Sequence, residues 1–247
     1  DPGKTHVLLL NDGAGHFTVK RNSGIEIGAG VDEETGKPLY GVGAAVFADL
    51  DGDANLDLYL GNGNTGSTGY YMSDQLFLGN GDGTFRDVSE RLRGVSESLS
   101  NGAMACDFDT DGDLDVFVST YGVSGPDHSQ KRLWINDGTG HFTNQAVARG
   151  VASQPGGNTW RADNDYGRLP EPGGTPGNYI GANGFGVDCP DINNDGNIDI
   201  LMATISHPSQ FPFPYGNYTR EQIDAMNYTR RWSDPSQVLV NQGAAGS

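Results

Sequence analysis

Basic residues are scarce in this chain of 247 residues, which has 15 Lys and Arg against 32 Asp and Glu and a formal net charge of −17. A surface this acidic repels phosphates, so nucleic acid is not an expected partner. Apolar runs are short, and none approaches the roughly 18 residues of a membrane-spanning helix. Because the chain starts at Asp1 without Met, we expect a processed or excerpted sequence whose export signal, if any, lies outside it.

Cysteine is scarce as well. Cys106 and Cys189 lie one and two residues before acidic segments of the same kind. Neighbouring repeats would bring them side by side, and a bridge is conceivable if their Cα atoms come within roughly 7 Å. The one-residue offset between them favours two free thiols, because it points the side chains in different directions. Two cysteines alone leave the redox compartment undecided.

Glycine is abundant, with 38 residues that gather with Asn and Asp between short apolar or alternating segments. This composition, poor in Lys and Glu, is typical of many short strands joined by tight turns. At this length the chain suits one all-β domain, or at most two domains.

Three acidic segments of nine residues share one register, and we call them the first, second and third acidic loops. They are residues 49–57 (DLDGDANLD), 107–115 (DFDTDGDLD) and 191–199 (DINNDGNID). A tight turn at Gly112 would swing positions 1, 3, 5 and 9 to one side, where a backbone carbonyl near position 7 completes an oxygen cage. Three unrelated surface turns would not share this register.

The ion predicted for these loops is Ca²⁺, at about three sites. Sulfur and imidazole ligands are absent from the loops, which argues against zinc and copper, and the carboxylates would repel one another without a cation. Three Ca²⁺ would raise the formal net charge of −17 by six, to about −11. The predicted ligands are Asp49, Asp51, Asp53, Asn55 and Asp57, then Asp107, Asp109, Asp111, Asp113 and Asp115, and then Asp191, Asn193, Asp195, Asn197 and Asp199.

An EF-hand is the alternative calcium motif, since it also begins Asp-x-Asp-x-Asp-Gly. It requires a bidentate Glu at position 12 and flanking helices. Position 12 is Leu60, Val118 and Met202 in the three loops, and the flanking segments have the short apolar or alternating patterns of strands. These differences exclude the EF-hand.

A Gly-rich turn motif accompanies the loops. Its copies are Leu8–Phe17 (LLLNDGAGHF), Leu76–Phe85 (LFLGNGDGTF), Leu133–Phe142 (LWINDGTGHF) and a shortened one at Val238–Gly246 (VLVNQGAAG). An apolar strand, an Asn/Gly turn and an aromatic residue that opens the next strand are typical of a hairpin. The full unit therefore has four strands, with the acidic loop after the first and the Gly-rich turn after the third, as in a propeller blade.

The pairing of the two motifs resembles the FG-GAP/VCBS repeat family, the β-propeller repeats of integrin alpha chains and many bacterial surface proteins. The stretch from Phe85 through Gly94-Val95 to the second acidic loop looks most similar to the extracellular branch that includes cartilage acidic protein. The resemblance implies an all-β, calcium-stabilised β-propeller over nearly the whole chain. Its parts would be a partial blade at 1–17 and blades at about 18–85, 86–142 and 143–247, with insertions at 152–182 and 206–236.

In this family the calcium loops share one face of the propeller, and the variable connections form the opposite face. We therefore expect an extracellular or cell-surface scaffold or adhesion module that binds a protein or glycan ligand on the face opposite the loops. Extracellular calcium modules bind at about 10⁻⁴–10⁻³ M, so their sites fill outside cells but not in a cytosol. The alternative is a carbohydrate-active enzyme such as a polysaccharide lyase, because one fold hosts many functions.

The variable connections, which include the insertions, hold further candidate residues. Exposed aromatic residues there suit contacts with sugars or partner chains, and Thr219–Gln222 predicts a capping box that opens a helix. His128 and His207 could act as general bases, whereas His16 and His141 recur with the repeat and are expected to be structural. The aromatic candidates are Trp160, Tyr215 and Trp232, and the candidate glycosylation acceptors are Asn217 and Asn227.

The strand count leaves the propeller incomplete. Three acidic loops define three full blades, while Leu8–Phe17 belongs to a blade whose first half is missing, and closed propellers typically need at least four blades. Either the chain is an excerpt of a longer propeller, or its leading hairpin completes a unit in a neighbouring copy by strand addition after Val238–Asn241 and builds a filament. The stop at Gly243–Ser247, where the pattern would continue to Gly-x-Phe, slightly favours the excerpt.

Overall fold

The computed structural model describes residues 6–26, 41–63, 72–93, 97–98, 100–120, 131–152, 184–204 and 237–243. Regular structure in these residues consists of β-strands and one 3₁₀ turn, η1 (Ser89–Arg91), which confirms the all-β prediction. The described part of the chain contains no helix long and apolar enough to span a membrane. The candidate residues of the variable connections lie outside the described residues, namely His128, Trp160, His207, Tyr215, Asn217, Thr219–Gln222, Asn227 and Trp232.

The strands form four successive antiparallel units, which we call the leading hairpin and the first, second and third sheets. The leading hairpin is β1 (Leu8–Asn11) and β2 (Phe17–Lys20), and the first sheet is β3 (Gly41–Ala48), β4 (Asp57–Gly63), β6 (Gln75–Gly79) and β7 (Phe85–Asp87). The second sheet is β10 (Ser100–Cys106), β11 (Asp115–Thr120), β12 (Arg132–Asn136) and β13 (Phe142–Asn144), and the third is β14 (Gly184–Asp188), β15 (Ile200–Thr204) and β16 (Gln237–Leu239). In addition, β8 (Leu92–Arg93) lies parallel to β13, and β5 (Met72–Ser73) pairs with β9 (Glu97–Ser98).

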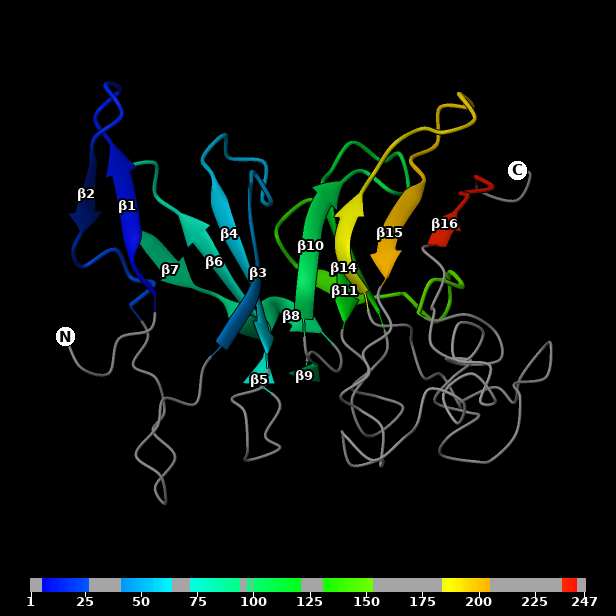
Figure 1. Ribbon diagram of the computed structural model, residues 1–247, viewed down its shortest axis with the longest axis horizontal. Helices are drawn as coiled ribbons and strands as arrows, with labels where there is room; N and C mark the ends of the chain where they lie inside the picture. Colours follow the sequence, from blue (N-terminus) through cyan, green and yellow to red (C-terminus); the bar gives the residue numbers. More distant parts are fainter. Residues whose placement is uncertain are drawn as a thin grey trace, which may run out of the picture.

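The strand registers place the two sequence motifs at the same edge of each sheet. Pairing of β3 with β4 ends at Ala48 opposite Asp57, so the first acidic loop begins where the ladder stops. Pairing of β6 with β7 ends at Gly79 opposite Phe85, on either side of the Gly-rich turn. The second sheet repeats this arrangement. In Figure 1 the acidic loop of the first sheet, that of the third sheet and the turn of the leading hairpin all lie along the upper edge.

The sheets stand side by side along the longest axis of the molecule, from the leading hairpin at one end to β16 at the other (Figure 1). The first strand of the second sheet, β10, contacts both β3 and β14. Because successive strand residues point to opposite faces, each sheet supplies alternate residues to two cores. In β11, Val116 joins the core shared with the first sheet, and Phe117 joins the core shared with the third.

A disulfide joins the second and third sheets through Cys106 at the end of β10 and Cys189 beyond β14, with Cα atoms 6.7 Å apart. The expectation of free thiols was therefore wrong. Cys189 lies after the last residue of β14, Asp188, so the strand alternation on which that expectation relied does not set its direction. The bridge spans 83 positions of sequence.

Replacing both cysteines, Cys106→Ala with Cys189→Ala, should destabilise the protein. The bond closes a long loop in the unfolded chain, and the chain-entropy estimate for a loop of this length is about 4.5 kcal/mol. Urea unfolding of the double variant and of the oxidised and reduced wild type measures the effect. Equal midpoints for oxidised and reduced wild type would show that the bridge contributes nothing.

A buried polar cluster ties the first and second sheets together at the strand ends opposite the acidic loops. Its centre is Asp74, which accepts hydrogen bonds from the Tyr59 hydroxyl (2.6 Å), the Asn62 N–H (2.8 Å) and the Ser100 hydroxyl (3.0 Å). The Trp134 indole N–H, from the second sheet, donates to the Tyr59 hydroxyl at 3.1 Å. Burial raises the pKa of Asp74 to about 6 in spite of these donors.

Asp74 should make the free energy of unfolding depend on pH, and the substitution Asp74→Asn should remove that dependence. The pKa of the carboxyl is 3.8 in the unfolded chain and about 6 in the folded protein. Between these two pH values the folded protein therefore binds a proton that the unfolded chain has released. Stability attributable to Asp74 therefore falls as pH rises from about 4 to about 6 and is level above that. The measurement is the difference in unfolding free energy between wild type and Asp74→Asn across this range. A rise with pH would mean that the donors and the nearby Arg132 charge stabilise the anion more than burial disfavours it.

Candidate metal centre

The last Asp of each acidic loop is fully buried and connects the loop to the Gly-rich turn of its own sheet. In the second sheet, Asp115 Oδ2 accepts from the Phe108 N–H (3.0 Å), and Oδ1 accepts from the Asn136 N–H (2.8 Å). The same two bonds form at Asp57, from Leu50 and Gly79, and at Asp199, from Ile192 and Asn241. One carboxylate therefore holds three chain segments together, a structural role that the ligand prediction did not include.

The first Asp of each loop folds the loop around itself by accepting hydrogen bonds from the loop backbone. Asp107 accepts from the N–H groups of Asp111 (3.2 Å) and Gly112 (3.1 Å), and Asp49 and Asp191 accept from corresponding N–H groups. The turn needs two left-handed residues rather than the single glycine expected. Positions 4 and 6 have positive φ in all three loops, and the non-glycine residues there are Ala54, Thr110 and Asn194. A left-handed alanine or β-branched residue is strained, so the first two loops must be stabilised by their other contacts, whereas Asn194 in the third tolerates this conformation.

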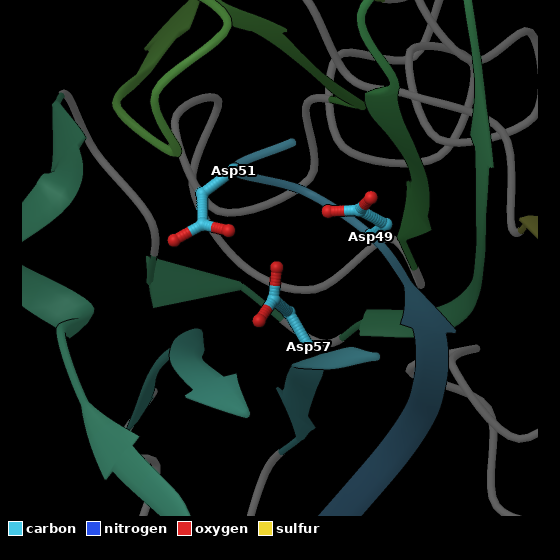
Figure 2. Close-up of side chains that lie close together, drawn as sticks. All are labelled: Asp49, Asp51 and Asp57. Carbon is cyan, nitrogen blue, oxygen red and sulfur yellow. The ribbon is translucent and has the colours of Figure 1, made fainter. Parts of the chain in front are cut away.

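Positions 1, 3 and 9 converge in the first two loops. The carboxylates of Asp49, Asp51 and Asp57 each offer an oxygen within 4.8 Å of the other two. Figure 2 shows the three side chains turned toward a common centre. The second loop repeats this arrangement, so each of these loops has three carboxylates that can hold one metal ion; the second set is Asp107, Asp109 and Asp115.

The same carboxylate oxygen in each cluster has no hydrogen-bond partner although it is buried. These oxygens are Asp51 Oδ1 and Asp109 Oδ1, both at position 3. A buried carboxylate oxygen without a partner is costly, and a hard cation would satisfy it. The donor set, made only of oxygen atoms, therefore fits Ca²⁺.

The electrostatics of the clusters also favour a bound cation. Burial, together with the neighbouring carboxylates of Asp109 and Asp111, raises the pKa of Asp115 to about 7. Burial likewise raises the pKa of Asp57, and burial followed by the charge of Asp53 raises that of Asp51. The raised pKa values mean that the cluster disfavours its own ionised carboxylates, and a divalent ion in the cluster would reverse that preference.

The predicted ligands at positions 5 and 7 lie apart from the three-carboxylate clusters. Asp53 and Asp195 are exposed and accept from the backbone and side-chain amides of Asn55 and Asn197. Asp111 is also exposed and accepts from the Asp113 N–H at 3.0 Å. Their coordination of an ion stays a prediction.

The third loop has Asn193 in place of Asp at position 3. Its Oδ1 accepts from the Asp195 N–H at 3.1 Å, and its Nδ2 donates to the Asp195 carboxylate at 2.8 Å. In the described residues, clusters of three carboxylates occur only in the first two loops. The predicted third calcium site, at Asp191, Asn193, Asp195 and Asp199, is therefore supported by the repeated loop geometry alone.

Two arginines that the sequence analysis did not single out lie beside the clusters. Arg149 Nη2 contacts Asp109 Oδ2 at 2.9 Å. The Arg91 charge offsets a small part of the rise in the pKa of Asp51 that burial causes, and its Nη1 donates to the Thr139 carbonyl in the Gly-rich turn of the next sheet at 3.0 Å. Each arginine follows the fourth strand of its sheet, a recurrence that the sequence could have revealed.

The Asn that opens the Gly-rich turn links neighbouring acidic loops. Asn136 Nδ2 donates to the Leu114 carbonyl of its own loop (3.0 Å) and to the Leu50 carbonyl of the preceding loop (2.8 Å). Asn241 repeats the pair with the carbonyls of Ile198 (3.2 Å) and Phe108 (3.0 Å). The sequence showed this Asn only as a turn residue.

Asn136→Ala should therefore destabilise the contact between the first and second sheets. It leaves two carbonyls without their donor, which costs about 1–3 kcal/mol. A matched control is Asn80→Ala, because the Asn80 side chain donates only within its own turn, to Thr84 Oγ1 at 2.9 Å. The control should change the unfolding free energy by no more than about 0.5 kcal/mol. Equal effects of the two substitutions in chemical unfolding would contradict the linking role.

The two described repeat histidines lie in exposed turns. His16 Nδ1 is 3.0 Å from Asp12 Oδ2, and His141 Nδ1 is 3.0 Å from Thr139 Oγ1. Both side chains contact residues of their own Gly-rich turn. This placement agrees with the structural role expected for them.

A sequence model of the FG-GAP-like repeat matches residues 49–118, from the first Asp of the first loop to just beyond the last Asp of the second. Both three-carboxylate clusters lie within this match. The match shows an FG-GAP-like repeat in this part of the chain and supports the predicted resemblance to the FG-GAP/VCBS repeat family. A search of curated proteins found no match.

Proposed function

We propose that this chain is a calcium-binding structural scaffold of β-propeller type, in which ions hold the acidic loops of successive blades. The observation that carries the proposal is the repeated cluster of three carboxylates with a buried, unpartnered oxygen at position 3. A single such cluster could be an acidic turn. Two in one register, inside a matched FG-GAP-like repeat, support a dedicated cation site.

Bound calcium would supply positive charge and oxygen coordination at the centre of each cluster. Hydrogen bonds of the chain's own residues would then connect the ordered loop to the sheets. Asp115 connects its loop to the backbone of Asn136, and the Asn136 side chain reaches the preceding loop. A loop that is ordered by calcium would therefore stabilise the contact between two neighbouring sheets.

We also propose an extracellular or cell-surface location, with a protein or glycan ligand bound on the face opposite the acidic loops. The Cys106–Cys189 disulfide supports this location, because disulfides persist mainly in oxidising compartments. The polysaccharide lyase alternative depends on insertions outside the described residues, so we prefer the scaffold.

The test is a comparison of Asp51→Asn with wild type in calcium and in excess chelator. In calcium, wild type should melt several degrees higher, because Asp51 completes the first site. In chelator, the melting temperature of wild type should no longer exceed that of the variant, because Asp51→Asn removes one of the carboxylates that repel one another. The control is Asp12→Asn, an exposed turn residue whose Oδ1 accepts from the Ala14 N–H at 2.8 Å, a bond that Asn can keep. A wild-type melting curve unaffected by chelator would refute the metal assignment.

A further inference from the structure

The aspartates at position 3 of the first two acidic loops differ in their charged neighbours. In the second loop, Asp109 Oδ2 lies 2.9 Å from Arg149 Nη2, while Asp109 Oδ1 is buried without a hydrogen-bond partner. In the first loop, Asp51 Oδ1 is also buried without a partner, but the described residues contain no ion pair to Asp51. Both aspartates belong to a cluster of three carboxylates. Of these two clusters, only the second therefore has a paired guanidinium among the described residues.

Arg149 is fixed by the turn that follows β13. Its backbone N–H donates to the Gln145 carbonyl at 2.9 Å, and its Nε donates to Gln145 Oε1 at 3.0 Å. Ala146 of the same turn is 1% exposed and packs in the core shared by the second and third sheets. The side chains of Arg149 and Asp109 are 34% and 21% exposed, so water screens their attraction only in part. Contacts outside the acidic loop therefore hold the guanidinium beside Asp109.

Arg91 follows the fourth strand of the first sheet, as Arg149 does in the second, but bonds to a different group. Its Nη1 donates to the Thr139 carbonyl of the next sheet at 3.0 Å. Gly140 lies beside both Arg91 and Asp51, since a Cβ at Gly140 would be 3.2 Å from Arg91 Nη1 and from Asp51 Cβ. Burial and the neighbouring carboxylates affect the pKa of Asp51 more than the Arg91 charge does. Arg91 is thus a matched contrast to Arg149, with the same charge but no ion pair to the carboxylate of its loop.

We propose that Arg149 is a built-in counter-ion of the second acidic loop, which competes with a divalent cation for Asp109 and keeps the loop folded when calcium is scarce. This inference rests on the calcium sites proposed above and adds the regulation of one of them. The guanidinium offsets one of the negative charges of the three-carboxylate cluster, so it weakens the attraction of the cluster for a metal ion. The same positive charge reduces the repulsion among the carboxylates when no ion is bound.

The two expected effects of removing this charge have opposite signs. Without the Arg149 charge the second loop should bind calcium more tightly, because the cluster regains its full negative charge. In chelator the same loop should be less ordered, because the repulsion is no longer offset. A residue that only supported the structure of the loop would not give this pair of effects, since its loss would weaken both calcium binding and order. The second loop also has one more carboxylate than the first, Asp113 where the first has Asn55, so the effect is measured by substitution and not by comparing the two sites.

The test is Arg149→Met, which keeps the apolar stem of the side chain and removes its charge. The Gly112 amide donates to Asp107 in the second loop, so its NMR signal reports calcium binding and its hydrogen exchange in chelator reports the order of the loop. Arg149→Met should lower the calcium dissociation constant of this loop by about threefold or more at low ionic strength, an effect that added salt reduces. In chelator it should speed the exchange of the Gly112 amide. Arg149→Gln, which is neutral but can still donate a hydrogen bond, should give the same two results and provides a second variant if one fails to fold.

The control is Arg91→Met, which removes the same charge beside the first loop. It should leave calcium binding to the second loop unchanged. At the first loop, followed at the Ala54 amide that donates to Asp49, it should change the dissociation constant by less than about threefold. Equal or weaker calcium binding at the second loop of the two Arg149 variants would overturn the proposal and leave the calcium sites intact. If the amides of neither loop respond to calcium in wild type, the sites themselves are refuted, and this proposal with them.

Discussion

The buried carboxylate at the end of each acidic loop is the interaction on which the rest of the structure depends. Its two oxygens accept backbone N–H groups from opposite directions, one from the loop and one from the end of the third strand. This bond pair recurs in all three sheets with distances of 2.8–3.0 Å. Burying a charge in this way is expensive unless it is well paired, and a cation bound in the cluster would provide the remaining compensation.

The acidic loops combine several features, each of which would destabilise the fold on its own. Each holds two left-handed residues, a non-glycine among them, and the first two bring three carboxylates within 4.8 Å of one another. In return, the first two loops each offer a backbone carbonyl to the Asn of the next sheet, Leu50 to Asn136 and Phe108 to Asn241. Strain and charge are therefore concentrated where neighbouring sheets are joined, so an ion bound in a loop would also affect the packing of the sheets.

Much of this architecture could be predicted from the sequence because it repeats. Three copies of the loop and four of the Gly-rich turn determined the strand order and the edge where both motifs lie. Contacts between repeats were harder to predict, since Asn136 and Asn241 look like ordinary turn residues until the preceding loop is seen beside them. The Cys106–Cys189 bridge was missed because strand alternation was extended past the end of β14. The ligands at positions 5 and 7 were predicted from spacing, and spacing alone does not reveal that Asp53 and Asp195 accept hydrogen bonds from their own neighbours.

Amide hydrogen exchange at Gly79 and Asn136 measures whether calcium stabilises the link between an acidic loop and its sheet. Both N–H groups donate at 2.8 Å to the last Asp of an acidic loop, so they report on the link between the loop and the sheet. We predict that calcium slows hydrogen exchange at both of these amides and at the amides of the acidic loops, and that chelator reverses the effect. Calcium-dependent protection confined to the loops, or none at all, would contradict it.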